Sequence, residues 1–247
     1  MSIVIPELFA SKTVKLVGAA NAALARYDVT LKSIEDLSIY RKILGLHETI
    51  SFLNLMNSNV SLDSYVKYTA HLIPESVRKS IPDECTIDIY AEFNYKKNRE
   101  LHQEIISEKN DTLILAAIQY ADIFVNNKPD VRNRGFYLLV SVYIPNYLCS
   151  HNVISCQMFY LSEYLLRHKE EYLQFVNGFQ GEKDLTHWIE FLLQAMKSQA
   201  DINNLKLIDM HNRFKLIMDK IGSKKNAAVF IKYCYQNPVF YTSRGQQ

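Results

Sequence analysis

The chain has 247 residues and a mass of 28.7 kDa, a size that suits one domain or one domain with a small appendage. Lys and Arg number 28 against 26 Asp and Glu, so the net charge is 28 − 26 = +2, and this balance, with a pI of about 8.2, argues against a nucleic-acid groove. Hydrophobic residues make up 48%, which excludes a wholly disordered chain. Because only 7 Gly and 6 Pro interrupt the sequence, we expect an all-α fold made mainly of long helices.

The sequence also indicates the cellular compartment of the protein. Four cysteines without a C-x-x-C pair are typical of reduced thiols in a cytoplasmic protein. The N-terminus has no basic segment before an apolar core, so we expect no secretion signal. The longest apolar run, Phe136–Ile144, is far shorter than the roughly 20 residues that a membrane helix needs. We therefore predict a soluble, cytoplasmic protein that makes no membrane contact.

The N-terminal third predicts three helices, over Glu7–Tyr27, Leu37–Leu55 and Leu62–Ile73. In the second helix, apolar residues recur at 4-3-4-3 spacing and define one face; they are Ile39, Ile43, Leu46, Ile50 and Leu53. The S-I-E-D stretch that begins at Ser33 matches a capping box, so Ser33 is expected to start this helix.

The middle of the chain is less regular. Residues 85–93 (CTIDIYAEF) alternate with a period of two and predict a short hairpin or edge strand. A helix is expected over Lys97–Val125, with a break near Asn110, and residues 126–135 form a polar loop. Residues 136–148 are β-branched and aromatic, and periodicity does not separate a buried helix from a buried strand there.

The C-terminal part predicts helices over Ser162–Asn177, which Gly178 ends, and over Leu185–Ala200. An apolar seam at 3-4-3-4 spacing follows, with Gly222 as its C-cap; it consists of Leu207, Met210, Phe214, Ile217 and Ile221. An apolar seam of this kind is usually buried against another helix. Packing within the chain is the favoured interpretation, and a homodimer through residues 205–221 is the alternative.

Most sequence motifs with known chemistry are absent. The chain has neither a phosphate-binding G-x-x-x-x-G-K-[ST] nor a G-x-G-x-x-G, and no G-x-S-x-G elbow. Its seven histidines never occur as H-x-x-x-H or H-E-x-x-H, so a histidine metal site is unsupported.

The polar loop at residues 126–135 is the one unusual feature. It carries the cations Lys128, Arg132 and Arg134 and the carboxylate Asp130 between two apolar elements. A solvated connection is the simpler interpretation. The functional alternative is an anion site in which the two arginines face phosphates and Asp130 holds a cation.

Several segments together resemble the Fic (filamentation induced by cAMP) domain family. Residues 158–173 (MFYLSEYLLRHKEEYL) resemble the family's helix after the active site, and residues 185–200 (LTHWIEFLLQAMKSQA) resemble the next helix. Residues 6–8 (PEL) and 19–28 (AANAALARYD) are similar to the opening of the long helical members. The resemblance covers most of residues 6–240, is specific in the C-terminal half, and is poor over 66–110. It implies a Fic-like helical bundle.

The resemblance locates the family's active loop, H-P-F-x-[DE]-G-N-G-R-x-x-R, at residues 126–137 (NNKPDVRNRGFY). Asn126 then occupies the position of the catalytic histidine, Asp130 retains the acidic ligand of Mg²⁺, and Arg134 retains the first arginine. Tyr137 replaces the second arginine. A second alignment, counted back from Tyr160, places Asp130 at the histidine position, and neither alignment finds a histidine.

In the same alignment, the residues that form the family's anion hole are replaced. Val131 and Asn133 stand where the family has glycines, and Arg132 stands at the asparagine between them. A β-branched valine resists positive φ, so the amides that would bind phosphates are expected to be misplaced. Arg132, Asn133 and Arg134 remain candidates for binding a nucleotide phosphate.

Two further features of the family are altered. The inhibitory glutamate of its regulatory helix aligns with Met56, and the next motif position is Asn57. Residues 226–240 (NAAVFIKYCYQNPVF) resemble the start of a winged-helix module, and the chain stops before a recognition helix, so DNA binding is not expected.

The resemblance therefore implies a Fic-like helical domain at 1–200, with N-terminal helices in 1–73 and a core in 97–200, and a C-terminal helical extension at 201–247. Family members transfer AMP from ATP to protein hydroxyls with the histidine as general base, and loss of a general base typically costs a factor of about 10² to 10⁴. We expect a regulatory protein without this activity that binds a nucleotide, with ATP and Mg²⁺ as the candidate ligands, or a protein partner. The alternative is a divergent nucleotidyltransferase that uses Asp130 and Arg134 with a base such as His102 or His151.

Overall fold

The computed structural model describes residues 10–55, 59–62, 111–126, 143–178, 182–222 and 224–236. These residues are mainly helical and contain no strand, which confirms the all-α fold. The helices are α1 (Ser11–Ser33), α2 (Ser38–Leu55), α6 (Thr112–Asn126), α8 (Ser162–Arg167), α9 (Lys169–Asn177), α10 (Glu182–Ile221) and α11 (Lys225–Gln236), and residues 143–150 are also helical. The predicted hairpin at 85–93 and the predicted helix over Leu62–Ile73 lie almost wholly outside the described residues.

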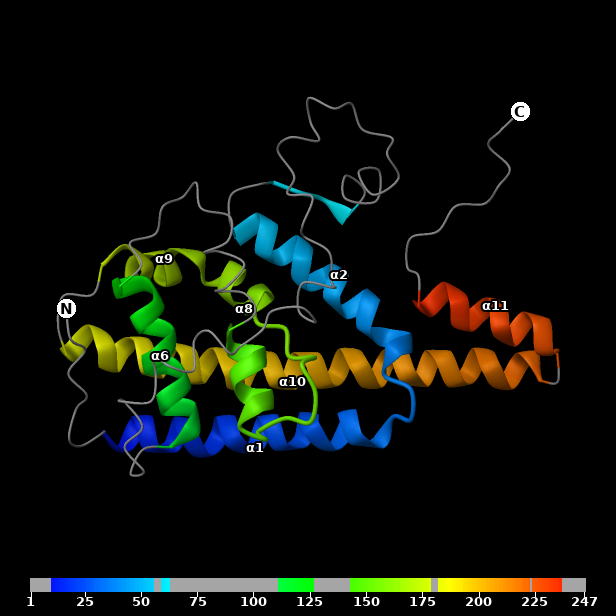
Figure 1. Ribbon diagram of the computed structural model, residues 1–247, viewed down its shortest axis with the longest axis horizontal. Helices are drawn as coiled ribbons and strands as arrows, with labels where there is room; N and C mark the ends of the chain where they lie inside the picture. The colour runs from blue at the N-terminus through cyan, green and yellow to red at the C-terminus, as the bar shows by residue number, and fades with distance from the viewer. Residues whose placement is uncertain are drawn as a thin grey trace.

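The molecule is organised around α10, whose 40 residues span about 60 Å. α1 lies alongside it and runs in the same direction (Figure 1). The polar contacts follow this parallel register, because Thr13 Oγ1 donates to Glu190 and Arg26 donates to Asp201 further along both helices. Small residues on the shared face, such as Ala20 and Ala23, are fully buried and let the helices pack closely.

The first half of α10 carries the main core. α6, helix 143–150, α8 and α9 gather over it (Figure 1), and Trp188 lies at the centre. The indole of Trp188 is fully buried and donates from Nε1 to the carbonyl of Ala117 in α6 at 2.8 Å. Aromatic rings surround it at centroid distances of 5.4 to 6.3 Å; they belong to Tyr120, Tyr172, Phe175 and Phe191.

The second half of α10 packs against α2 and α11. Tyr40 of α2 lies edge-on to Phe214 of α10 and to Tyr235 of α11. Leu207 is fully buried, and Met210 and Phe214 are partly buried against the core. For these residues the predicted seam packs within the chain, as favoured from the sequence. None of the described α11 side chains is buried.

Several helix ends differ from the sequence prediction. α1 extends to Ser33, past the predicted end at Tyr27, and α10 continues past the predicted end at Ala200 to Ile221. The proposed capping box at Ser33 is wrong, because Ser33 is the last residue of α1 and its hydroxyl donates backwards to the carbonyl of Thr30 at 2.8 Å. Asp36 takes the capping role instead, since its carboxylate accepts the N–H of Ser38 at 3.2 Å. The predicted helix over Ser162–Asn177 is interrupted at His168, where φ is −114° and ψ is 35°, and so divides into α8 and α9.

Other predictions of helix ends are confirmed. α6 begins beside the expected break, with the N–H of Leu113 bonded to Asp111 at 2.8 Å. Gly222 ends α10 with φ at +59°, a conformation that glycine adopts without strain. The ambiguous segment 136–148 is helical over its described part, residues 143–148. α10 runs unbroken through residues 200 and 201, where the sequence places a domain boundary.

Candidate functional site

Of the residues assigned to the predicted active loop, Asn126 alone lies within the described part of the chain, as the last residue of α6. α6 starts near α1, since Asn21 donates to Asp111 at 3.1 Å, and its 15 residues carry Asn126 about 22 Å away along the helix axis. Trp188 anchors the middle of this helix through Ala117. The other predicted site residues lie outside the described residues; they are Met56, Asn57, Asp130, Arg132, Asn133, Arg134 and Tyr137.

The structure separates His151 from Asn126. Tyr143 stacks on Tyr120 with ring centroids 5.9 Å apart, so helix 143–150 lies against the middle of α6. His151 follows Tyr143 by eight residues, in a segment that runs towards α1, because Asp28 of α1 accepts the N–H of Ser155. From Tyr120, α6 continues for six residues in the opposite direction, to Asn126. Fourteen residues of helix correspond to about 20 Å. His151 is therefore far from the position where a general base would replace Asn126, and His102 lies outside the described residues.

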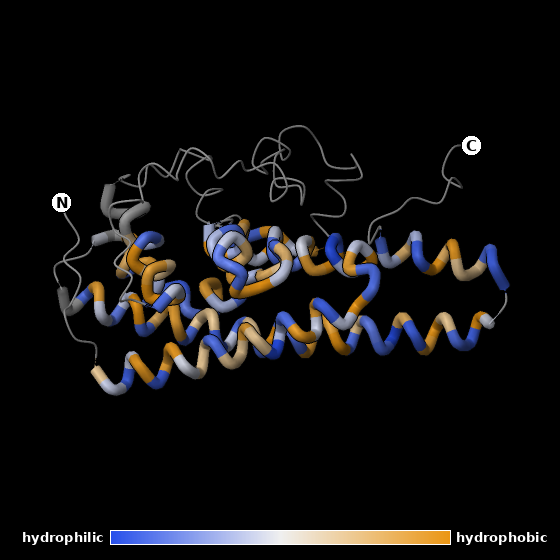
Figure 2. The backbone as a smooth tube through the Cα atoms, turned by 60° about the horizontal axis from the view of Figure 1, so that its bottom comes forward, coloured by the Kyte–Doolittle hydropathy of each residue, from blue (hydrophilic) through white to orange (hydrophobic). Residues whose placement is uncertain are grey.

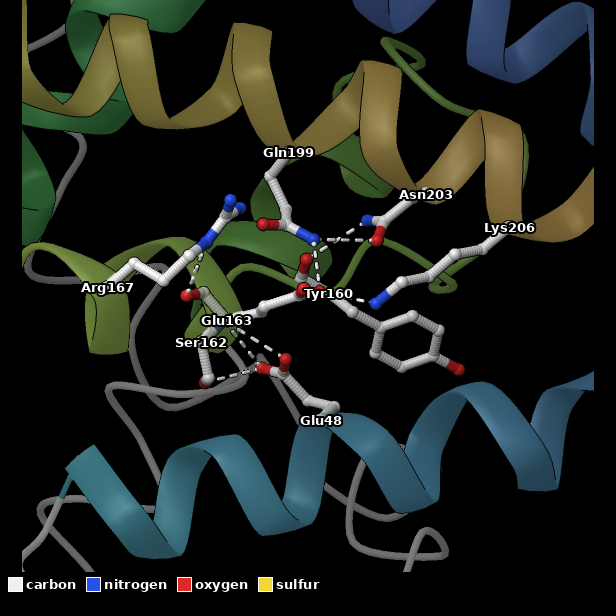
Figure 3. A network of polar contacts seen from close by, with 8 residues as sticks. All are labelled: Glu48, Tyr160, Ser162, Glu163, Arg167, Gln199, Asn203 and Lys206. Atoms are coloured by element: carbon white, nitrogen blue, oxygen red, sulfur yellow. Dashed lines mark hydrogen bonds and ion pairs between the residues drawn. The ribbon is translucent and has the colours of Figure 1, made fainter.

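The most extensive described polar cluster lies where α2, α8 and α10 meet. We call it the polar junction; it comprises Glu48, Tyr160, Ser162, Glu163, Arg167, Gln199, Asn203 and Lys206 (Figure 3). Figure 3 shows Glu48 reaching from α2 towards the start of α8, and Gln199, Asn203 and Lys206 reaching in from α10.

Glu48 is the most deeply placed charge in the junction, with 2% of its surface exposed. Its carboxylate accepts the backbone N–H of Ser162 at 3.0 Å and the Ser162 hydroxyl at 2.6 Å. Both donors stand at the first turn of α8, where backbone N–H groups lack helical partners. The carboxylate thus replaces the missing partners and ties α2 to α8.

A second chain of contacts ties α8 to α10. Glu163 accepts hydrogen bonds from Lys206 Nζ at 2.5 Å and from Gln199 Nε2 at 3.3 Å. Gln199 also donates to Asn203, and Asn203 donates to the carbonyl of Tyr160 at 3.0 Å. The three helices are therefore connected by directional bonds between side chains that are largely buried.

The junction encloses a hollow of about 10 Å³, which has room for one water molecule. Leu44 and His47 complete its lining. A nucleotide does not fit this space, so the junction holds helices together and does not bind a substrate of that size.

The electrostatics of the junction follow from burial and from Lys206. Burial alone would raise the pKa of Glu163, but the hydrogen bond and charge of Lys206 outweigh it and hold this pKa below its usual value. Partial burial of the ring, together with the charge of Lys206, lowers the pKa of His47. Burial raises the pKa of the Tyr160 hydroxyl, which stays neutral.

Neither a metal cluster nor an activated thiol is found among the described residues. They contain no group of three or more His, Cys, Asp or Glu side chains that could hold a metal ion. Cys149, Cys156 and Cys234 are free thiols, and burial raises the pKa of the first two, which makes them weak nucleophiles at neutral pH.

Comparison with known proteins does not assign this chain to a family. No family model matches it, and no curated protein is significantly similar to it. Within the part of the chain that the structure describes, no helix combines the length and apolar character required to cross a membrane.

The role of Glu48 was missed from the sequence, although a signal for it exists. It follows Leu44 by one turn and precedes Phe52 by one turn, so it stands in line with the buried apolar face of α2. A carboxylate at such a position requires partners. Its partner Ser162 lies 114 residues away, and only the tertiary fold identifies it.

Proposed function

We propose that this chain is a Fic-like cytoplasmic protein that has lost AMP transfer and works as a regulatory protein that binds a nucleotide or a protein partner. The observation that carries the proposal is Asn126 at the position of the family's catalytic histidine. A carboxamide does not accept the proton that leaves the attacking hydroxyl, so the general base is missing.

The environment of the buried residues supports a retained scaffold. Met158, Phe159, Tyr164 and Trp188, which belong to the two segments with the most specific resemblance, are all in the core. Burial of these residues is what a Fic-like helical bundle would require of the two segments. In the proposed relationship, they belong to the frame of the domain, and residues 126–137 would carry its chemistry.

The changed loop also bears on ligand binding. Asp130 supplies one carboxylate for Mg²⁺, and Arg132 and Arg134 supply charges for phosphates. Val131 and Asn133 replace the glycines that would let backbone amides approach a triphosphate. These residues favour weaker nucleotide binding than an intact anion hole would give.

Isothermal titration of the full chain with ATP and Mg²⁺ tests the nucleotide part. Heat of binding that disappears in Arg134→Ala and persists in Arg167→Ala supports a nucleotide held by the loop, because both substitutions remove one arginine but Arg167 lies in the polar junction. A flat trace with the wild-type chain contradicts nucleotide binding and leaves a protein partner as the ligand.

Label transfer tests the loss of activity. The chain is incubated with α-labelled ATP, Mg²⁺ and a cell lysate, and we expect no label on protein. Labelled protein with the wild-type chain and none with Asp130→Ala would contradict the proposal and favour the divergent nucleotidyltransferase. The distance of His151 from Asn126 makes His151 a poor base for that alternative.

A further inference from the structure

The side of α10 that meets α1 continues beyond the end of α1. Glu190 and Asp201 bond to α1, and they share one side of α10 because 201 − 190 = 11 residues is close to three turns. After Arg26, the partner of Asp201, α1 has 33 − 26 = 7 residues left, whereas α10 has 221 − 201 = 20 after Asp201. The later part of this side therefore extends past α1.

Apolar residues continue along this side of α10, first beside the last turns of α1 and then past its end. From Asp201, steps of 4, 3, 4 and 4 residues lead to Leu205, Ile208, Asn212 and Leu216 on the same side of α10. Their apolar members are exposed by 67%, 38% and 59% respectively. On α1, Val29 follows Arg26 by one turn and is 67% exposed. We call these five residues the outer stripe.

The outer stripe is distinct from the apolar seam of the same helix. The seam residues Leu207, Met210 and Phe214 turn towards α2 and α11 and are packed there. Figure 2 shows polar and apolar residues interspersed along α10 where it continues past α1. α10 therefore carries two separate lines of apolar residues in this region, the seam and the outer stripe, and the seam is covered within the chain.

We infer that the outer stripe is a self-association surface, on which α10 of a second copy packs antiparallel across a two-fold axis. A helix placed there contacts the end of α1 at Val29 and the part of α10 beside and beyond it. The rim suits a second copy, since it holds two carboxylates, Asp209 and Asp219, and two cations, Arg213 and Lys215. Asp209 and Arg213 already form an ion pair at 2.9 Å, so neither charge sign dominates the rim.

Asn212 fits the centre of such an interface. It lies four residues from Ile208 and four from Leu216, so an antiparallel pair centred on it brings Ile208 against Leu216 of the partner subunit. Asn212 then faces Asn212 of the partner subunit. A carboxamide both donates and accepts hydrogen bonds, and a single asparagine within an apolar stripe is a known device for fixing register.

The outward side of α11 is a less suitable surface for a second copy. It exposes Val229 by 64%, but residues 224–236 contain three lysines and no carboxylate. Lys232 is paired with Asp36, and Lys224 and Lys225 would repel the same lysines of a second copy. Val229 therefore provides a matched control, because it is about as exposed as the outer-stripe leucines.

Sedimentation equilibrium of the full chain over about 5 to 200 µM tests the inference, a range chosen because interfaces of modest size are often micromolar. We expect the mass to rise with concentration from 28.7 kDa towards twice that value. Leu216→Glu should weaken association at least tenfold, and Val229→Glu should leave it unchanged, with unaltered circular dichroism in both variants. A monomer at every concentration, or a dimer that Val229→Glu dissociates and Leu216→Glu does not, would overturn the inference.

Cross-linking tests the two-fold arrangement separately. Asn212→Cys should give a disulfide-linked dimer under mild oxidation at concentrations where the wild-type chain, with its own four cysteines, gives none. A wild-type dimer whose Asn212→Cys variant does not cross-link would contradict an antiparallel pair centred on this residue.

Discussion

The carboxylate of Glu48 receives both the backbone N–H and the side-chain hydroxyl of Ser162, at 3.0 and 2.6 Å. The two residues are 114 positions apart, and Glu48 is 2% exposed. A buried carboxylate is costly unless its oxygens are bonded, and here both donors come from the first turn of α8. This bond therefore fixes where α8 begins relative to α2.

Removing this carboxylate should destabilise the fold substantially. Glu48→Ala leaves two donors of Ser162 buried without a partner, and hydrogen bonds to a charged group are worth about 1.5 to 3 kcal/mol each. We expect the free energy of unfolding to fall by about 3 kcal/mol, measured by urea denaturation with Trp188 fluorescence as the signal. The exposed Glu35→Ala serves as the control and should cost about 0.5 kcal/mol or less. Equal losses in the two variants would contradict a specific role for Glu48.

Replacing Trp188 should lower the stability of the fold even when the new residue is aromatic. Trp188→Phe keeps a ring in the core but removes the Nε1–H that bonds to Ala117 O, so this carbonyl keeps only its partner within α6. Adding the cavity left by the smaller ring, we expect a loss of about 3 kcal/mol in unfolding free energy, measured by circular dichroism. Val14→Ala, at a residue 61% exposed, should change stability little. A Trp188→Phe variant as stable as the wild type would show that the indole N–H is dispensable.

The Glu163–Lys206 pair should make stability sensitive to acid. The folded-state pKa of Glu163 lies below its unfolded value of about 4.5, so its contribution is present above pH 4.5 and is lost as the pH falls through the folded value. Lys206→Met should lower stability at pH 7 and make the fall between about pH 5 and 3 shallower. Arg213→Met breaks an exposed pair and should leave this part of the profile unchanged. Urea midpoints at each pH provide the measurement, and parallel profiles for wild type and Lys206→Met would refute the prediction.

Two histidines should add a second, milder pH dependence. The pKa values of His47 and His211 are lowered in the folded state, by partial burial and by the nearby charges of Lys206 and Lys215 respectively. The unfolded chain therefore binds more protons below about pH 6.5, and stability declines as the pH falls from about 7. A His47→Gln, His211→Gln double variant should have a flatter profile between pH 7 and 5. NMR titration provides a direct check, and a ring pKa at or above 6.5 for either histidine would contradict its part of the prediction.

The helix ends show how far local sequence rules extend. The periodicity of residues 37–55 and the stop at Gly222 were predicted correctly, because both depend on residues within one or two turns. The prediction for Ser33 was wrong, since a serine hydroxyl can cap the next helix or bond backwards to the helix it ends, and sequence spacing does not distinguish these choices. The resemblance identified residues 158–173 and 185–200 through aromatic and apolar residues that the structure places in the core.

By itself, the sequence determined the helical class of this protein, several of its helix ends among the described residues, and the absence of a histidine at residues 126–137. These properties follow from residue type and short-range periodicity. The tertiary structure alone decided that Glu48 meets Ser162, that His151 stands far from Asn126, and that one side of α10 is packed while another is exposed. Each of these depends on which distant segments pack together, and burial and hydrogen bonding settle that choice over the whole chain.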